Sequence, residues 1–242
     1  MTGTTHDHRR VITIDGPVAA GKSTVARELA DRVGATLFDT GTLYRAVTLA
    51  ALRREIDPGA SDELAELAMT RRIDIARPTP GTGRLYDVSL DGEDVTELIR
   101  DPAVDRHVSA VSAHPAVRAA LLPVQRDIAS RGTVVMVGRD TGSVVVPNAG
   151  LKVYLDASPD ERARRRHAEI VARGGELTYD EVLADLRRRD AFDATREASP
   201  LTVADGAVVI RSDGKTVAAL VAEIAALALD RWERSAAAGD AA

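Results

Sequence analysis

Residues 16–23 read Gly-Pro-Val-Ala-Ala-Gly-Lys-Ser and fit the pattern Gly-x-x-x-x-Gly-Lys-Ser, in which x is any residue. A largely apolar run at residues 11–14 directly precedes this stretch and is typical of a short buried strand. Val25, Leu29 and Val33 follow it at helical spacing. A glycine-rich turn between a strand and a helix N-terminus directs several backbone N–H groups at one point, where they bind an anion. The stretch therefore predicts a loop that binds nucleotide phosphates.

Individual residues of this phosphate loop have distinct expected roles. Glycine permits the tight turns that bring the N–H groups together. Lys22 is expected to reach the outer phosphates and Ser23 to bind a magnesium ion. Only three of the 32 basic residues are lysines, yet one of them stands in the loop. The predicted phosphate-binding residues are Gly16, Pro17, Val18, Ala19, Ala20, Gly21, Lys22, Ser23 and Thr24.

The overall composition is ordinary for a soluble enzyme, with 45% hydrophobic and 29% charged residues. The net charge of -5 argues against general binding to nucleic acid or to anionic membranes. The absence of cysteine excludes disulfides, thiol catalysis and cysteine-ligated metal sites. The first ten residues are polar, unlike a signal peptide, and no apolar run approaches membrane-spanning length. We therefore expect a cytoplasmic protein.

Strand and helix patterns alternate along most of the chain. This alternation predicts one parallel sheet between two layers of helices, a three-layer α/β/α fold. Strands are expected at residues 11–14, 35–38, 133–137, 152–155 and 207–210. Helices are expected at residues 24–33, 44–54, 61–70, 115–130, 160–173, 178–189 and 217–232. Ser61 is expected to cap its helix, Thr178 and Glu181 have the spacing of a capping box, and Pro123 should kink its helix.

The middle of the chain departs from this alternation. Residues 72–76 and 85–90 alternate apolar and polar side chains, and residues 78–83 between them are rich in proline and glycine. Asp91-Gly92 is typical of a hairpin turn before residues 94–96. We therefore expect a small antiparallel insert here.

Arginines and acids follow two of the predicted strands. Asp39 and Arg45 come after the second strand, and Arg139 and Asp140 directly follow residues 133–137. Ligands of open α/β sheets bind at these carboxyl ends, beside the phosphate loop. The arginine fork matches phosphate oxygens, and phosphoryl transfer needs positive charge because its transition state spreads negative charge over the equatorial oxygens. Asp39 has an equally good alternative role as a helix cap.

The residues alone leave more than one function open. A phosphate loop occurs in kinases, switches and motors, but the chain lacks the Asn-Lys-x-Asp motif with which a GTPase reads guanine. A further group of arginines and acids at residues 189–196 favours a second phosphorylated or acidic substrate. The arginine-rich run 162–166 fits either surface charge or a closing lid. The alternatives are a kinase of a small acceptor such as UMP or shikimate, and a regulatory NTPase that signals to a partner.

Several segments resemble the bacterial cytidylate kinases, in the same order along the chain. Besides the phosphate loop they are FDTGTLYR at 38–45, DGEDVT at 91–96, VGRDTGSVV at 137–145 and REASPL at 196–201. The resemblance covers about residues 11–227. It implies a monomeric enzyme that uses ATP and Mg²⁺ to phosphorylate CMP or dCMP. No protein nucleophile is then needed, because an oxygen of the acceptor phosphate attacks in line.

The resemblance also implies a set of site residues. Arg45 and Arg139 would clamp the acceptor phosphate, and Asp193 would hold the sugar. The acceptor site as a whole would be Thr40, Arg45, Ser109, Arg118, Arg139, Asp140, Asp193 and Arg196. The catalytic residues would be Lys22, Arg139, Asp140 and Arg189, and the lid arginines Arg162, Arg165 and Arg166. Four residues depart from the family pattern: Ala19, Thr141, Phe192 and Thr195.

The expected domain organisation follows from these assignments. We expect a nucleotide-monophosphate-binding region at residues 41–118 and a lid at 159–175. The core would comprise residues 11–40, 119–158 and 176–234. Flexible ends are expected at residues 1–10 and 235–242.

Overall fold

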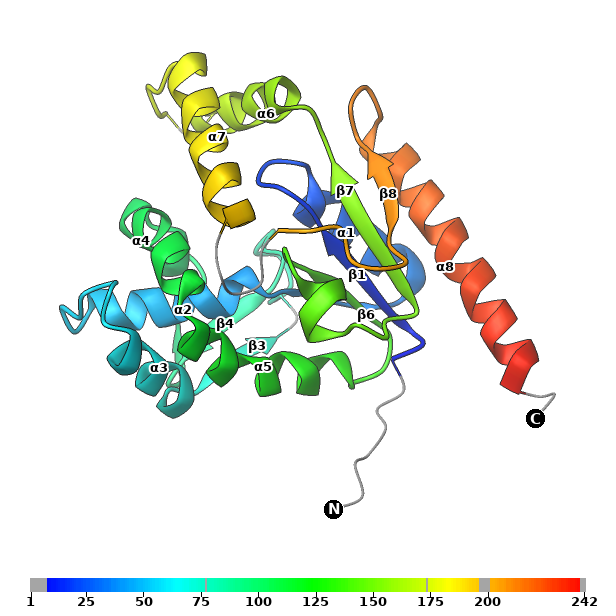
Figure 1. Ribbon diagram of the computed structural model, residues 1–242, viewed down its shortest axis with the longest axis horizontal. Helices are drawn as coiled ribbons and strands as arrows, with labels where there is room; N and C mark the ends of the chain where they lie inside the picture. The colour runs from blue at the N-terminus through cyan, green and yellow to red at the C-terminus, as the bar shows by residue number, and fades with distance from the viewer. Residues whose placement is uncertain (1–7, 77, 173, 196–200, 240–242) are drawn as a thin grey trace.

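A five-stranded parallel sheet forms the centre of the molecule (Figure 1). The computed structural model describes residues 8–76, 78–172, 174–195 and 201–239. The strands lie in the order β2-β6-β1-β7-β8, and every neighbouring pair is parallel. Their bounds are β1 Val11–Asp15, β2 Thr36–Asp39, β6 Val134–Val137, β7 Leu151–Asp156 and β8 Val208–Arg211. The predicted parallel α/β fold is confirmed.

Helices cover both faces of this sheet. On one face α1 and α8 pack against the side chains of Ile14 and Leu155, and on the other α2 and α5 pack around Phe38 and Met136. Burial of these two apolar faces supplies the main stabilisation of the three layers. The helices are α1 Lys22–Val33, α2 Gly41–Leu52, α3 Ser61–Thr70, η1 Leu98–Arg100, α4 Pro102–Ala113, α5 Pro115–Ala129, η2 Thr141–Val145, α6 Pro159–Ala172, α7 Tyr179–Thr195 and α8 Val217–Gly239.

Several element ends differ from the sequence prediction. Ser61 is the first residue of α3 rather than its cap, because Ala60 holds the N-cap position. The capping box before α7 is confirmed: the backbone N–H of Glu181 donates to Thr178 Oγ1 at 3.3 Å, and the Glu181 carboxylate accepts from the Thr178 backbone N–H at 2.8 Å. That helix continues to Thr195, six residues beyond the predicted end.

Both chain ends carry regular contacts in the described residues. The carbonyl of His8 accepts hydrogen bonds from the backbone N–H groups of Val11 and Gly150, so residues 8–10 are tied to the sheet. Helix α8 runs to Gly239, through most of the expected flexible tail. Trp232 packs on the core as expected and lies under the guanidinium of Arg10, at 5.4 Å from its ring centroid.

The middle of the chain forms the predicted antiparallel insert. Strands β3 Ile73–Ala76, β4 Asp87–Leu90 and β5 Glu93–Asp94 make a three-stranded sheet. The turn between β4 and β5 places Asp91 at a φ of 53° and Gly92 at 90°. Positive φ at both central residues matches the right-handed twist of a hairpin, which is why Asp-Gly predicted this turn correctly.

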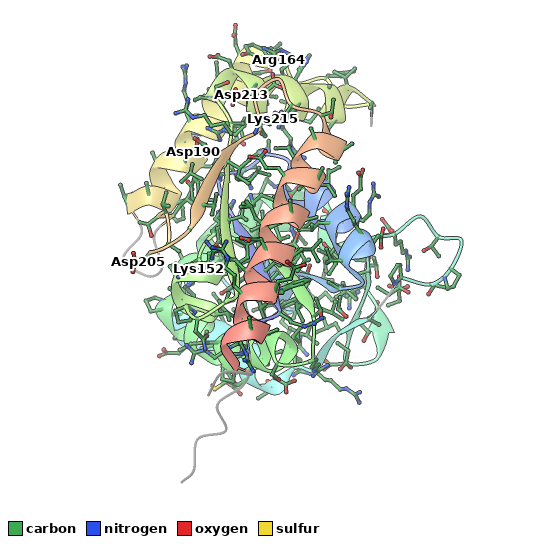
Figure 2. The ribbon with its side chains drawn as sticks, turned by 90° about the vertical axis from the view of Figure 1, so that its right-hand side faces the viewer. Lys152, Arg164, Asp190, Asp205, Asp213 and Lys215 are labelled. Atoms are coloured by element: carbon green, nitrogen blue, oxygen red, sulfur yellow. The ribbon has the colours of Figure 1, made fainter. Side chains whose placement is uncertain are left out.

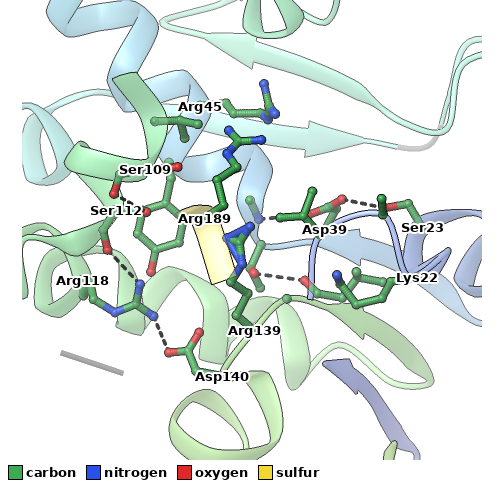
Figure 3. Close-up of a pocket in the computed structure, with 18 residues that line it drawn as sticks. Lys22, Ser23, Asp39, Arg45, Ser109, Ser112, Arg118, Arg139, Asp140 and Arg189 are labelled. Atoms are coloured by element: carbon green, nitrogen blue, oxygen red, sulfur yellow. Dashed lines mark hydrogen bonds and ion pairs between the residues drawn. The ribbon is translucent and has the colours of Figure 1, made fainter. Parts of the chain in front are cut away.

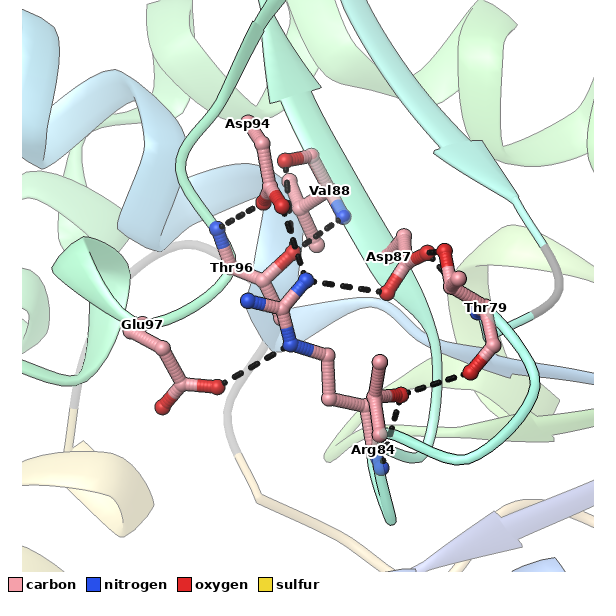
Figure 4. Close-up of polar contacts among 8 residues, drawn as sticks. Thr79, Arg84, Asp87, Val88, Asp94, Thr96 and Glu97 are labelled. Atoms are coloured by element: carbon pink, nitrogen blue, oxygen red, sulfur yellow. Dashed lines mark hydrogen bonds and ion pairs between the residues drawn. The ribbon is translucent and has the colours of Figure 1, made fainter.

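The side chain of Arg84 fastens the loop between β3 and β4 (Figure 4). Its guanidinium pairs with Asp94 at 2.7 Å, Glu97 at 3.2 Å and Asp87 at 3.3 Å. The hydrogen bonds to Asp94 and then Asp87 raise the pKa of Arg84. Asp87 also accepts the backbone N–H of Thr79 at 2.8 Å. Charge therefore holds the Arg84 part of the loop on the insert, while the adjoining Leu85 and Tyr86 pack against the hydrophobic core.

Helices α6 and α7 form a hairpin at the top of the molecule in Figure 1. Ala163 of α6 packs with Val182 and Leu186 of α7, and the partly buried Val18 and Ala19 of the phosphate loop lie against this cluster. Helix α7, which the sequence prediction assigned to the core, thus packs against α6, the helix of the predicted lid. The hairpin rests directly on the phosphate loop.

Candidate functional site

The phosphate loop turns sharply between β1 and α1. Gly16 has a φ of 145°, and a Cβ there would lie 2.1 Å from the carbonyl oxygen of Leu155. Gly21 is the N-cap of α1 with a φ of 93°. Both positions therefore require glycine for their positive φ, and Gly16 also requires it because a Cβ would clash. The loop ends at a helix N-terminus, whose free N–H groups favour an anion.

Lys22 carries the buried positive charge of the loop. Its Nζ donates to the carbonyl oxygen of Pro17 at 2.7 Å. Burial, and after it the nearby positive charge of Arg139, lower the pKa of Lys22 to about 8. A phosphate at this point would supply the counter-charge that the buried ammonium lacks. The position therefore favours binding of an anion.

Ser23 and Asp39 form a small set of oxygen ligands beside the loop. Ser23 Oγ donates to Asp39 Oδ2 at 3.2 Å, while Asp39 Oδ1 accepts the backbone N–H of Gly41 at 3.0 Å. The N-cap of α2 is Thr40, so Asp39 is not the cap of that helix; its carboxylate contacts the first residue of α2 and faces Ser23. Hydroxyl and carboxylate oxygens are ligands that Mg²⁺ accepts, together with waters and substrate phosphates. These residues fit a magnesium ion carried by a nucleotide.

A cavity of about 250 Å³ opens beside Lys22 at the carboxyl ends of β2 and β6 (Figure 3). We call it the acceptor cavity. Arginines approach it from four elements or their ends, which concentrates positive charge in one place. The structure brings these predicted site residues together in its wall: Lys22, Ser23, Thr40, Arg45, Ser109, Arg118, Arg139, Asp140 and Arg189.

A buried ion pair forms one side of the acceptor cavity. Arg118 Nη2 contacts Asp140 Oδ2, and Arg118 Nη1 donates to the carbonyl oxygen of Ser112 at 3.0 Å. The same guanidinium lies over the ring of Tyr44, 5.2 Å from its centroid. Ser112 was not singled out from sequence, because only the fold brings α4 and α5 together with Asp140 here. The pair fixes Asp140 at the cavity wall.

Asp193 reaches the site through Arg139. Its carboxylate pairs with Arg139 Nε at 2.9 Å, and its side chain is only 4% exposed. In this structure Asp193 therefore holds the Arg139 side chain in the cavity wall. Arg196, the other predicted acceptor residue of this segment, lies outside the described residues. Phe192, on the neighbouring turn of α7, is largely exposed.

All three predicted lid arginines make contacts within the protein, and Arg166 pairs with Glu169 of its own helix at 3.2 Å. Arg162 is buried and forms a two-pronged pair with Asp190, at 3.0 and 2.6 Å. Arg165 donates to the carbonyl oxygens of Ala20 at 3.2 Å and Ser212 at 2.9 Å. Arg162 therefore joins α6 to α7, and Arg165 joins α6 to the phosphate loop and to the residue after β8.

Asp15 is a site residue that the sequence reasoning missed. It ends β1, is 3% exposed, and accepts hydrogen bonds from Thr141 N at 2.9 Å, Thr141 Oγ1 at 2.7 Å and Gly142 N at 2.7 Å. Burial raises the pKa of Asp15 despite these bonds. The unusual Thr141 is thereby explained, since its hydroxyl donates to this carboxylate. A charged residue closing an apolar strand was the available signal.

A second cavity of about 500 Å³ lies on the outer side of the phosphate loop. Its walls come from the loop, α6 and the start of α8, and they include Arg165, Arg166, Lys215 and Thr216. Figure 2 shows Lys215 and Asp213 close to the end of α6 that carries Arg164. The phosphate loop therefore separates two cavities, so that a phosphoryl group held by Lys22 could face both.

Ala19 adopts a backbone conformation that favours glycine, with a φ of 61°. We expect Ala19→Gly to raise the free energy of unfolding by about 0.5–1 kcal/mol, because glycine adopts this conformation without the steric cost of a Cβ. Urea titration followed by circular dichroism measures the change. Ala20→Gly is the matched control: Ala20 is fully buried and lacks a positive φ, so that change should destabilise the protein. Equal losses at both positions would contradict the assignment of strain to Ala19.

Within the described residues, no helix has the length and apolar character needed to cross a membrane. No group of three or more histidine, cysteine, aspartate or glutamate side chains in the same part of the chain is placed to hold a metal ion. Of the histidines, His107 lies in α4, whereas His114 is the C-cap of that helix and contacts the carbonyl oxygen of Pro58 at 2.7 Å.

Known proteins resemble this chain over nearly its whole length. A protein from Herpetosiphon aurantiacus named cytidylate kinase is 50% identical, over 85% of this chain and 88% of its own. One of the same name from Roseiflexus castenholzii is 49% identical, over 93% and 96%. A crystal structure of an uncharacterized protein from Eubacterium ventriosum shares the fold, with a TM-score of 0.50 at 12% identity, over 92% of this chain and 99% of that one.

The family match agrees with the site geometry. The family model described as cytidylate kinase matches residues 12–229, which include the phosphate loop, the insert and the acceptor cavity. The family resemblance predicted from the sequence is thus confirmed. The chain belongs to the cytidylate kinase family.

Proposed function

We propose that this protein transfers the γ-phosphate of ATP to CMP or dCMP and so forms the corresponding diphosphate. One observation carries the proposal: the phosphate loop and a group of arginines face each other across a single cavity. The loop provides a site for the donor phosphates, and Arg45 and Arg139 provide a site for a second phosphate. The names of the relatives support cytidine nucleotides as the acceptors.

In this proposal the residues act by position and charge. An oxygen of the acceptor phosphate attacks the γ-phosphorus of ATP in line, the bond to the β-phosphate oxygen breaks, and ADP leaves. Lys22, Arg139 and Arg189 surround the point of transfer with positive charge. Burial strengthens their action on the transition state, because the low dielectric weakens screening. No side chain need form a covalent intermediate.

The acceptor nucleoside would lie along the wall that Arg118 and Asp140 build. Thr40 and Ser109 line the same wall and offer hydroxyl groups to the base or to groups beside it. Thr40 Oγ1 already donates to the carbonyl oxygen of Val137 at 3.0 Å, which fixes its orientation. Asp193 would act on the sugar directly or through Arg139.

Mg²⁺ would enter with ATP and be held by the nucleotide phosphates, the Ser23 hydroxyl and the Asp39 carboxylate. When bound, it neutralises charge on the phosphates and supports their in-line geometry. The proposal includes a monomeric, cytoplasmic enzyme whose partners are its nucleotides. The net charge of -5 supports the absence of nucleic-acid and membrane partners.

A panel of acceptors tests this function. Initial rates of ADP release are measured with CMP, dCMP, UMP, AMP and shikimate at fixed Mg-ATP. We expect kcat/KM for CMP or dCMP to exceed that for each other acceptor by about a hundredfold, because buried polar groups left unpaired by the wrong base or sugar cost binding energy. ADP release that ignores every acceptor would instead favour a regulatory NTPase. Preference for UMP or shikimate would reassign the acceptor.

A further inference from the structure

Asp105 of α4 stands where three arginines from separate helices converge. Its Oδ1 pairs with Arg45 Nη2 of α2 at 2.6 Å, and its Oδ2 lies 3.9 Å from Arg166 Nη2 of α6. Its backbone carbonyl accepts a hydrogen bond from Arg189 Nη2 of α7 at 3.2 Å. The side chains of Asp105, Arg45 and Arg166 are each about one third exposed, so they can rearrange. One carboxylate thus links the acceptor cavity to the lid.

The contact with Asp105 competes with phosphate binding by Arg45. Both terminal nitrogens of Arg45 are engaged within the protein, Nη2 with Asp105 and Nη1 with the carbonyl oxygen of Ile99 at 2.9 Å. A two-pronged grip on a phosphate uses such a pair of N–H groups. Arg45 must therefore give up its present partners, in part, when an acceptor phosphate enters.

The opposite contact of Asp105 spans an open cleft. A cavity of about 800 Å³ separates α4 from the α6–α7 hairpin. Arg106 and Ser109 line it on the α4 side, and Leu177, Ala184, Arg188 and Phe192 on the other. The wide Asp105–Arg166 separation of 3.9 Å is what a small closing movement would shorten. Closure of this cleft would bring Arg166 nearer to the acceptor cavity.

We propose that Asp105 is a positioning residue that exchanges Arg45 for Arg166 when the acceptor phosphate binds, and so couples acceptor binding to lid closure. The proposal rests on the function proposed above. In the free protein Asp105 neutralises Arg45. When the acceptor phosphate binds Arg45, the Asp105–Arg45 ion pair breaks. The Asp105 carboxylate then attracts Arg166, and this attraction draws the lid arginine across the cleft.

The exchange predicts opposite changes in two measured quantities for Asp105→Asn. CMP binding without donor, measured by calorimetry, should tighten about two- to fivefold, because Arg45 no longer has to leave a carboxylate. The second quantity is the coupling factor, the ratio of the Kd values of a non-hydrolysable ATP analogue without and with CMP. This factor should fall about fivefold or more, and kcat should fall with it. Asp105→Glu keeps the carboxylate and should retain most of the coupling.

Asp101→Asn is the matched control. It removes the same charge one turn earlier in α4, and asparagine can still accept the capping N–H of Ala103, which Asp101 accepts at 2.7 Å. It should leave both quantities unchanged. The proposal is overturned if Asp105→Asn binds CMP more weakly, or if its coupling and kcat are unchanged. Equal effects of Asp101→Asn would also overturn it. If the wild-type protein ignores CMP in the acceptor panel, the proposed function fails instead.

Discussion

Alanine in place of Lys22 is expected to lower kcat about a thousandfold or more, because in the proposed function its buried ammonium would hold the transferred phosphate. The fold should persist. Burial lowers the pKa of Lys22 to about 8, so the charged side chain is held there at a cost to the free protein. Its hydrogen bond to the carbonyl of Pro17 offsets only part of that cost. The thermal midpoint should therefore stay the same or rise.

Steady-state kinetics with CMP and thermal melts check this result. Lys152→Ala is a close control, since Lys152 Nζ also donates to the carbonyl of a proline five residues earlier, Pro147, at 3.0 Å. Lys152 lies outside the acceptor cavity and should be dispensable for turnover. Retained activity in Lys22→Ala would refute the role of the loop. A large loss of turnover in Lys152→Ala would show that the hydrogen bond from lysine to a proline carbonyl, rather than the positive charge at the phosphates, is needed for activity.

Replacing Arg139 with alanine is expected to lower kcat/KM for the acceptor about a hundredfold, because the cavity loses a guanidinium between the two phosphates. It should also cost about 1–3 kcal/mol of stability, since the nearly buried Asp193 loses the positive charge paired with it. The two effects have different causes. The first depends on charge facing the substrate, and the second on charge left inside the protein.

The double variant Arg139→Ala/Asp193→Asn separates them. Neutralising Asp193 should restore much of the stability lost in Arg139→Ala, measured by urea unfolding, but none of the lost turnover. Recovery of activity together with stability would mean that Arg139 acts only as a structural partner of Asp193. Additive losses of stability would show that the pair does not interact.

Local pattern predicted the parts of the fold whose causes are local. The phosphate loop, the Asp91-Gly92 turn and the Thr178–Glu181 capping box each depend on a few neighbouring residues, and all three lie where expected. Ser61 failed as a cap because Ala60, one residue earlier, took the N-cap position. The end of α7 was missed since its arginine-rich sequence shows weak apolar periodicity, whereas packing against α6 carries the helix to Thr195.

Contacts between distant segments could not be read from pattern. Arg162, Arg165 and Arg166 look equivalent in sequence. In the structure the first two contact Asp190 and Ser212, whereas Arg166 pairs with Glu169 and faces Asp105 across the cleft. Asp15 and Asp105 were missed because their partners lie on other elements, more than a hundred and about sixty residues away. Such pairings become visible only when the chain is folded.

The sequence by itself determined the donor side of this protein, because a phosphate loop is built from consecutive residues whose backbone does the binding. It also determined the family, through several short segments in a fixed order. Only the tertiary structure decided which arginines remain available for a phosphate. The availability of each arginine depends on which carboxylate lies beside its guanidinium in the folded protein. Ion pairs between distant segments produce no periodic pattern in the sequence, so they cannot be predicted from it.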